Sequence, residues 1–175
     1  IIVAIIVSTL TNRLKKQREI ALYQEEVTSK INQISSGFLN LSGYEEIRTY
    51  CQDRLYNLTK IKNEVFLYQN KEFQDLMAWW CYCHGEPCGK DQKKFTYLKE
   101  VYLPIKKDNY TYGTIKFDCN QRTITDEDLI YIKTIIAELI LVLQRDLLSH
   151  EKEEARLQVE REKLKSTLLR SISHD

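Results

Sequence analysis

The sequence is poor in the two residues that interrupt helices. It contains 5 glycines and 2 prolines in 175 residues, and residues 126–175 contain neither. A long disordered linker is therefore not expected, and the composition favours helices around a compact α/β region. A helix over residues 126–175 would extend roughly 75 Å at 1.5 Å per residue.

An excess of charge of one sign is also absent. Lysine and arginine number 26 and aspartate and glutamate 25, so the net charge is +1. This balance gives no general attraction to nucleic acid, and no nucleic-acid partner is expected. A glycine-rich phosphate-binding loop is missing as well, so the chain alone is not expected to be catalytically competent with a nucleotide.

A hydrophobic run long enough to cross a bilayer is missing. Residues 1–10 carry no charge, but a membrane helix needs about 20 such residues. The run is followed at once by Arg13, Lys15, Lys16 and Arg18. Basic residues after an apolar run are typical of the cytoplasmic end of a membrane helix, whereas a signal peptide carries them before it. We therefore expect residues 1–12 to be the end of a truncated transmembrane helix, the alternative being a buried helix start, and both chain ends to be cuts in a longer protein.

The cysteines do not suggest a disulfide-stapled secreted domain. There are 5, an odd number, and three of them lie within residues 81–88. A reducing, cytoplasmic compartment fits this better. Cys81, Cys83, His84 and Cys88 are a weak zinc candidate, because their spacing departs from that of common structural sites. Redox sensing and ordinary packing are the alternatives, and no metal is expected.

The first half of the chain shows helical periodicity. Apolar residues recur at spacings of three and four up to Leu41, which predicts a linker helix over residues 13–41. A second helix is expected to start with Ser42 as N-cap and Glu45 as its capping-box partner. Its predicted buried face consists of Ile47, Cys51, Leu55 and Leu58.

The middle of the chain alternates between strand and helix signals. Residues 63–69 read as a strand, and residues 71–83 are expected to form a helix that Gly85 and Pro87 then end. The side chains predicted to face inward from that helix are Phe73, Leu76, Met77 and Trp80.

A β-hairpin is expected next. Residues 101–105 and 112–117 are rich in strand-forming side chains, and the hydrophilic residues 106–109 predict the turn between them. Pro104 cannot donate a hydrogen bond to a neighbouring strand, so its strand should lie at an edge or beside a bulge. The elements within residues 42–124 together predict a compact α+β domain.

The C-terminal stretch predicts one very long helix. Thr125 is expected to cap it, with the acidic residues 126–128 in the first turn, where the helix dipole favours anions. Steps of seven give one row of Leu129, Ile136, Leu143, His150, Leu157 and Leu164, and a second row of Ile132, Leu139, Asp146, Glu153, Glu160 and Thr167. Further apolar residues expected to pack on the sheet are Ile130, Ile135, Ile140 and Val142. The rows favour a parallel dimeric coiled coil over residues 125–160 with a soft, polar joint, the alternative being a solvated helix.

His174 has the most specific functional pattern. It lies on the predicted helix and is followed by Asp175, and a largely neutral imidazole can act as a nucleophile. Residues 160–175, which end in Leu-Leu-Arg-Ser-Ile-Ser-His-Asp, resemble the start of the dimerisation and phosphoacceptor domain of sensor histidine kinases. This version looks most like the KdpD family of potassium-responsive kinases. The pattern Trp80-x3-His84-Gly85-x-Pro87-x-Gly89 is similar to the signature of the GAF-like domain in that family.

The resemblance implies a GAF-like domain over residues 42–124, with a small, mainly antiparallel sheet flanked by helices. It implies that residues 161–175 begin the phosphoacceptor domain, with His174 phosphorylated and Asp175 as its acidic helper. The full protein would be a homodimeric kinase of the bacterial cell membrane that uses ATP and magnesium, passes phosphate to a response regulator and regulates potassium uptake. This chain would lie on the cytoplasmic side and hold no cofactor itself.

A ligand site is a second expectation. GAF-like domains often bind small molecules over the sheet, and aromatic side chains line such pockets. The candidate ligand-binding residues are Trp80, His84, Tyr102 and Tyr112. The same side chains also suit an ordinary core. The alternatives to a signalling fragment are a small-molecule or ion-binding regulatory module and a membrane-anchored coiled-coil scaffold without phosphotransfer.

Overall fold

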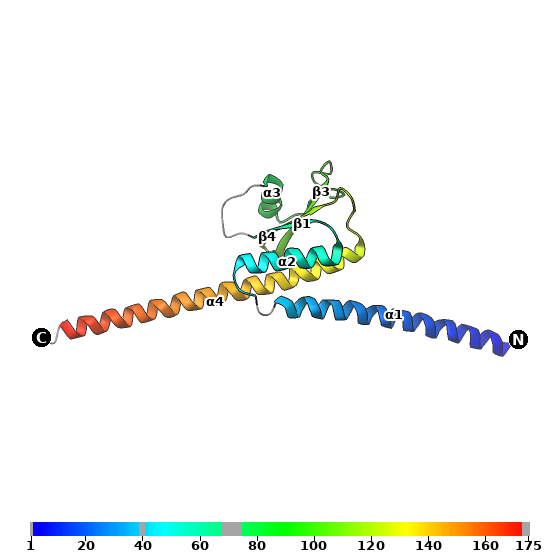
Figure 1. Ribbon diagram of the computed structural model, residues 1–175, viewed down its shortest axis with the longest axis horizontal. Coiled ribbons are helices and arrows are strands. Elements are labelled where there is room, and N and C mark those ends of the chain that lie inside the picture. Colours follow the sequence, from blue (N-terminus) through cyan, green and yellow to red (C-terminus); the bar gives the residue numbers. More distant parts are fainter. Residues whose placement is uncertain (1, 39–40, 68–74, 173–175) are drawn as a thin grey trace.

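The computed structural model describes residues 2–38, 41–67 and 75–172. Its elements are α1 (Ile2–Phe38), α2 (Tyr44–Thr59), β1 (Asn63–Leu67), α3 (Leu76–His84), β2 (Cys88–Gly89), β3 (Glu100–Lys107), β4 (Tyr110–Asp118) and α4 (Asp126–Ile172). The strands form one antiparallel sheet in the order β1-β4-β3-β2. In Figure 1, α2 and α4 lie on one face of the sheet, α3 lies on the other, and α1 and α4 leave the domain at opposite ends. The expected α+β class is confirmed.

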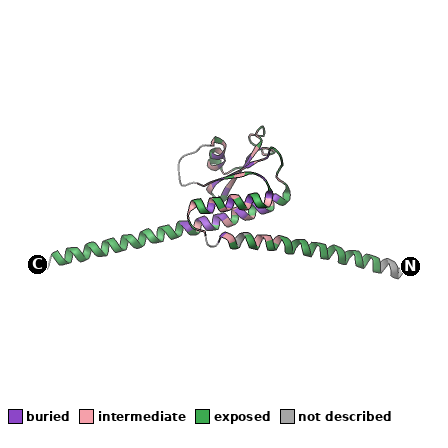
Figure 2. Ribbon diagram, in the orientation of Figure 1, coloured by how far each residue is buried: buried purple, intermediate pink, exposed green. Residues whose placement is uncertain are grey.

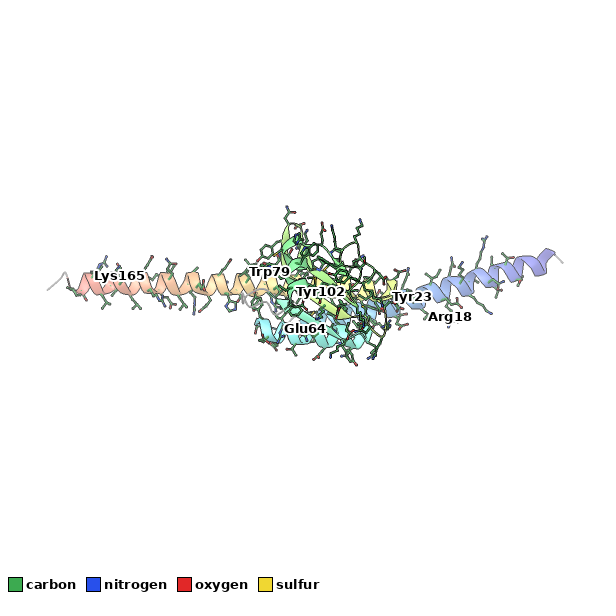
Figure 3. All side chains as sticks on the ribbon, turned by 90° about the horizontal axis from the view of Figure 1, so that it is seen from above. Arg18, Tyr23, Glu64, Trp79, Tyr102 and Lys165 are labelled. Atoms are coloured by element: carbon green, nitrogen blue, oxygen red, sulfur yellow. The ribbon has the colours of Figure 1, made fainter. Side chains whose placement is uncertain are left out.

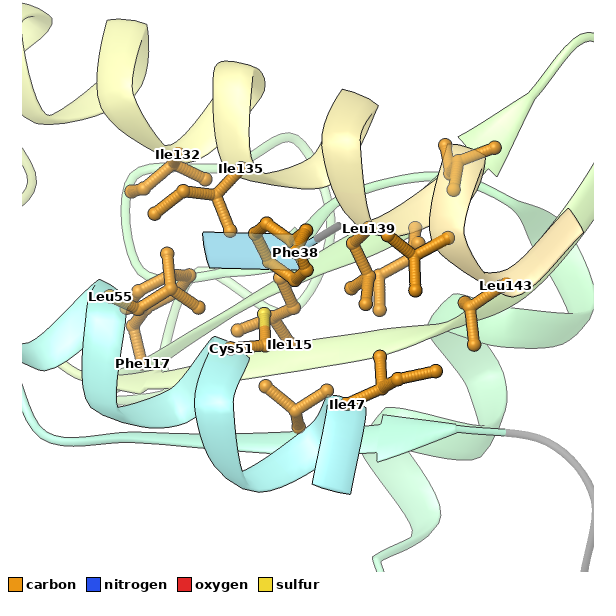
Figure 4. Packing of buried hydrophobic residues seen from close by; sticks show 14 of the residues in the cluster. Phe38, Ile47, Cys51, Leu55, Ile115, Phe117, Ile132, Ile135, Leu139 and Leu143 are labelled. Carbon is orange, nitrogen blue, oxygen red and sulfur yellow. The ribbon is translucent and has the colours of Figure 1, made fainter. Parts of the chain in front are cut away.

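Alternation along the strands gives the sheet two faces. The strand residues buried toward α2 and α4 are Val65, Val101, Ile105, Ile115 and Phe117. They meet the predicted inner face of α2, in which Ile47, Cys51 and Leu55 are fully buried and Leu58 is partly buried (Figure 4). Full burial of one such aliphatic or aromatic side chain contributes about 1.5–3 kcal/mol, so this layer is the main core of the domain.

The start of α2 differs from the prediction. Ser42 is not its N-cap, and α2 begins at Tyr44 after Gly43, without a side-chain cap. The Ser42 N–H donates to the Glu46 carboxylate at 3.2 Å instead. The Gly43 N–H donates to Asp146 of α4 at 3.1 Å. A residue distant in the sequence thus satisfies this helix start, which is why the local capping pattern misled.

The β3–β4 hairpin is confirmed, with longer strands and a tighter turn than expected. Only Asp108 and Asn109 lie between the two strands. Pro104 lies past the part of β3 that pairs with β2, just before a bulge between Ile105 and Lys106. Pro104 therefore has the position near an edge and a bulge that its missing N–H favours.

Of the helix predicted over residues 71–83, the part from Leu76 onward is confirmed, and residues 71–74 lie outside the described residues. It begins at Leu76 because the Asp75 carboxylate caps it. Leu76 is 77% exposed, contrary to the prediction, and the buried residues are Ala78 and Cys81. The other residues predicted to face inward are Met77 and Trp80, which are partly buried, and Phe73, which lies outside the described residues. Because Asp75 is the N-cap, Leu76 is the first residue of α3, and its side chain faces solvent.

α1 unites the predicted membrane end and the linker into one helix. Residues 7–26 are exposed, and the helix meets the domain near its C-terminal end, where Phe38 is 1% exposed. None of the helices in the described ranges is both long and apolar enough to cross a bilayer.

α4 is one unbroken helix of 47 residues, as predicted. Thr125 and Asp128 form a capping box, in which the Asp128 N–H donates to Thr125 Oγ1 at 3.2 Å and the Thr125 N–H donates to Asp128 Oδ2 at 2.9 Å. The buried residues of α4 extend to Asp146, and every later residue that the structure describes is exposed (Figure 2).

Several residues at the start of the predicted coiled-coil seam are buried in the core of the domain itself and so do not face a second helix. The seam residues buried in this way are Ile132, Leu139 and Leu143. Ile135, Ile140 and Val142 are buried as expected, whereas Ile130 is 48% exposed, contrary to the prediction. A helix face that packs on a sheet and one that packs on a second helix have nearly the same period, so spacing could not separate them.

Candidate functional site

The predicted phosphoacceptor His174 and its neighbour Asp175 lie outside the described residues. The apolar residues that precede them are Leu168, Leu169 and Ile172, which are 61%, 57% and 74% exposed. The last described turns of α4 therefore stand away from the domain, at the end opposite to the start of α1 (Figure 1).

A polar cluster joins α3 to the sheet. The Asp75 carboxylate accepts hydrogen bonds from the Lys116 ammonium at 2.9 Å and from the Tyr102 hydroxyl at 3.1 Å, in addition to the N–H groups that it caps. Burial alone would raise the pKa of the Asp75 carboxyl, but hydrogen bonds from Lys116 and from the Ala78 N–H outweigh it, and the pKa lies below its ordinary value. Burial also opposes the charge of Lys116, yet the Asp75 carboxylate holds the pKa of Lys116 above its ordinary value. The pair is therefore charged at neutral pH.

Three of the four candidate ligand residues share the α3 face of the sheet. The Trp80 and His84 rings stack with centroids 4.2 Å apart, and His84 Nδ1 lies 2.9 Å from the Trp80 carbonyl oxygen. Trp80 packs edge-on against Phe95 at 5.1 Å, and both belong to the small apolar cluster around Tyr102. Figure 3 shows Tyr102 over the middle of the domain, far from Arg18 and Lys165 on the projecting helices.

Tyr112 lies on the other face. It packs against the main core, and its hydroxyl accepts a hydrogen bond from the Gln144 amide of α4 at 2.7 Å. At the bulge, Ile105 of β3 pairs with Gly113 of β4 and the next residue, Lys106, pairs with Thr111. Tyr112 is therefore an extra residue of β4 without a partner on β3. Simple alternation along β4 would place it on the same face as Tyr102, and the bulge reverses that direction. The structure therefore does not bring Tyr112 together with the other three candidates.

The four members of the zinc candidate do not converge. Cys81 and Cys88 are buried with their thiols in hydrogen-bond contact, whereas Cys83 and His84 are exposed. Burial raises the pKa of Cys81 to about 12 and that of Cys88 to about 11, so both thiols are protonated at neutral pH. In the part of the chain that the structure describes, no group of three histidine, cysteine, aspartate or glutamate side chains is placed to hold a metal ion.

α1, α2 and α4 meet at a joint that sequence reasoning missed. The Leu41 carbonyl accepts a hydrogen bond from the Arg145 guanidinium, and the Gly43 N–H donates to Asp146. Asp146 is 6% exposed, and its Oδ2 lies 3.6 Å from His150 Nε2. The joint ties the segment between α1 and α2 to the point where α4 leaves the domain. Its sequence signal was Asp146, the first polar residue of the heptad row that begins with Ile132 and Leu139.

Comparisons with known proteins agree with this architecture. No family model matches the chain. The sensor protein KdpD of Clostridium acetobutylicum is 27% identical to it and that of Escherichia coli K12 is 21% identical, each over 99% of this chain. The chain spans about a fifth of the length of these curated relatives, 22% and 21%. The crystal structure of the native GAF domain of the potassium sensor histidine kinase KdpD from Escherichia coli matches with a TM-score of 0.60 at 16% identity, covering 74% of this chain and 99% of that one.

The four-stranded antiparallel sheet with helices on both faces thus has the fold of a GAF domain, and a long C-terminal helix continues it. Over nearly its whole length the chain is similar in sequence to a segment of the KdpD sensor proteins. The resemblance to a KdpD-type GAF fragment is therefore confirmed.

Proposed function

We propose that the chain senses and transmits signals within a membrane-bound sensor histidine kinase of the KdpD type. The observation that carries the proposal is the path of the helices, since α1 enters the domain at one end, α4 leaves at the other, and both are fastened at the joint around Asp146. A displacement of α1 or of the domain would change the direction in which α4 leaves. The phosphoacceptor domain beginning at residues 161–175 would receive that change.

The proposed phosphoacceptor is His174. Its neutral imidazole nitrogen attacks the γ-phosphorus of ATP, the bond from that phosphorus to the bridging oxygen breaks, and ADP leaves with that oxygen. Asp175 is proposed to stabilise the positive imidazole. The phosphoryl group then passes to an aspartate carboxylate of a response regulator. The groups that bind ATP and magnesium would come from another part of the full-length kinase.

The proposed setting is the cytoplasmic side of a bacterial cell membrane, because basic residues follow the apolar start of α1. Regulation of potassium uptake is the proposed role, since the relative with the same fold is named a potassium sensor histidine kinase. A parallel homodimer through α4 is proposed because the projecting part of α4 carries exposed apolar residues, among them Leu148, Leu157 and Leu164.

Phosphorylation of the full-length kinase with γ-labelled ATP tests this function. His174→Gln is expected to abolish acid-labile phosphate on the protein. His150→Gln is the matched control, because His150 is an exposed histidine on the same helix, and it should retain the label. Asp175→Asn should slow labelling by roughly 100-fold. Undiminished label on His174→Gln would refute the assignment, and a wild-type protein that takes up no label would favour the scaffold function.

The polar cluster on the α3 face favours a second function, the binding of an ion or small molecule by the GAF domain. Asp75, Lys116 and Tyr102 present charges and a hydroxyl beside the Trp80–His84 stack. Titration of the chain with potassium, against sodium as control, should change its tryptophan fluorescence if this cluster binds the ion. An identical response to both ions would exclude potassium as a specific ligand.

A further inference from the structure

A groove lies between the open edge of β3 and α4. Its volume is about 500 Å³, which falls in the range of about 300–1,000 Å³ that is usual for small-molecule sites. β2 pairs with β3 only at Val101 and Tyr102, so among the described residues no strand lies beside the rest of this edge. The α4 side of the groove extends from Lys133 to Leu141, a rise of about 12 Å.

The groove is lined by apolar side chains and by lysines. Its apolar residues are Pro104, Ile136, Ala137, Ile140 and Leu141, and its three lysines, all exposed, are Lys106, Lys107 and Lys133. Within the described ranges none of these lysines forms an ion pair with a carboxylate. The Lys107 ammonium donates to the Gln144 amide oxygen at 3.5 Å, and the Lys106 ammonium donates to the Gly85 carbonyl, also at 3.5 Å. The groove therefore combines apolar surface with positive charge that no carboxylate neutralises.

We propose that this groove binds a free single-chain amphiphile with a negatively charged head, such as a fatty acid carboxylate. The contact between Lys107 and Gln144 places the β3 lysines at the end of the groove near Leu141. The carboxylate binds there, and the acyl chain runs along Ile136 toward the aliphatic stem of Lys133. Burial of methylene groups and charge-assisted hydrogen bonds to the ammonium groups favour the complex. The groove shares no residue with the polar cluster on the α3 face, so this site goes beyond both functions proposed above.

The edge of β3 disfavours an extended peptide as the occupant. A peptide that adds a strand to a sheet needs a row of backbone N–H and C=O groups along the edge. Pro104 has no N–H, and the register shifts at the bulge between Ile105 and Lys106. Proline, bulges and lysines are the features by which sheet edges resist the addition of a strand. A ligand that needs no backbone hydrogen bonds fits this edge better.

A lipid of the bilayer is disfavoured by distance. The Lys30 ammonium lies 5.7 Å from the centre of the Tyr131 ring, so this level of α1 lies beside the start of α4. From Leu10, where the uncharged run ends, to Lys30, α1 rises about 30 Å. The groove begins at Lys133, just after Tyr131, and extends toward Leu141, away from the start of α1 (Figure 1). With the apolar start of α1 at the membrane, as proposed above, a lipid that stays in the bilayer does not reach the groove.

Calorimetric titration of the 175-residue chain with decanoate, below its critical micelle concentration, tests the ligand class. The wild type is expected to bind decanoate at one site. Decanol has the same chain without the charge and should bind at least about 10-fold more weakly, because it forms no charge-assisted hydrogen bond with the lysines. Equal affinities for the two compounds, or no binding of decanoate, would refute the proposal.

Variants of the lining residues test the place of binding. Ala137→Trp puts an indole into the groove from an exposed position and should weaken decanoate binding by about 10-fold or more. Ala155→Trp is the matched control, since Ala155 is an exposed alanine on the projecting part of the same helix, and it should bind like the wild type. Lys107→Gln should weaken binding by about 10-fold, whereas Lys152→Gln, at an exposed lysine outside the groove, should not. Circular dichroism should show all four variants folded. Wild-type affinity of Ala137→Trp or of Lys107→Gln would contradict the assignment.

Two further arms separate the other occupants. Cosedimentation with phosphatidylglycerol vesicles should be the same for Ala137→Trp and Ala155→Trp. A loss of vesicle binding in Ala137→Trp alone would assign the groove to a bilayer lipid and overturn the free amphiphile. A peptide of alternating leucine and glutamate should not displace bound decanoate, and displacement would favour a peptide occupant instead.

Discussion

Single carboxylates connect the elements of this domain. Asp75 caps α3 and pairs with Lys116, Asp128 completes the capping box of α4, and Asp146 holds the Gly43 N–H. Asp128 also accepts two hydrogen bonds from the Arg122 guanidinium, at 3.1 and 2.9 Å. Each carboxylate satisfies N–H donors that a helix start or a turn would otherwise leave unpaired.

Asp75 should contribute to loss of stability in acid. Its folded-state pKa lies below the ordinary value, so its charged form stabilises the fold above the unfolded pKa of about 4, and this contribution is lost as the pH falls through the folded pKa. Asp75→Asn is expected to cost about 1 kcal/mol at neutral pH and to flatten the dependence of stability on pH below about pH 4.

Urea unfolding across this pH range measures the effect. Asp53→Asn is the matched control, because Asp53 is an exposed carboxylate on α2, and it should behave like the wild type. A pH dependence of Asp75→Asn equal to that of the wild type would contradict the expectation.

At the scale of elements, the sheet depends on a close approach of β1 and β4. A Cβ on Gly113 would lie 2.1 Å from the Phe66 carbonyl oxygen, and β1 cannot move away without losing its pairing with β4. Gly113→Ala is therefore expected to destabilise the domain by about 1–3 kcal/mol. Thr111→Ala on the same strand is the control and should stay within about 0.5 kcal/mol of the wild type. Equal unfolding midpoints for the two variants in urea would show that β1 adapts.

Helix and strand positions could be predicted from the sequence where they depend on residues that are close together in the chain. Thr125 as the cap of α4 and the inner face of α2 were both predicted, because a cap bonds within its own first turn and the apolar spacing of a helix face is visible in the sequence of that helix. The start of α2 was mispredicted, because its partner Asp146 lies 103 residues away. Tyr112 was grouped with Tyr102, because a bulge that sequence alternation does not reveal turns it to the other face.

At the scale of the whole molecule, two helices leave one side-mounted domain in opposite directions, and the joint connects them (Figure 1). Asp146→Ala removes the acceptor of the Gly43 N–H and is expected to cost about 1–3 kcal/mol of stability. The Gly43 amide should then exchange its hydrogen faster, whereas Asp53→Ala should change neither property. Protection of the Gly43 amide equal to that in the wild type would mean that the joint does not depend on this carboxylate.

The sequence by itself determined the α+β class, the hairpin, the uninterrupted α4 and the resemblance to a KdpD-type sensor protein, because propensity, caps and the spacing of apolar residues are local properties. Only the tertiary structure decided which faces of α4 are used. Ile132, Leu139 and Leu143 turn into the core, and Ile130 and Leu141 remain in solvent. Each of these residues is apolar at helical spacing, and burial depends on where the sheet and α2 lie, which periodicity does not encode.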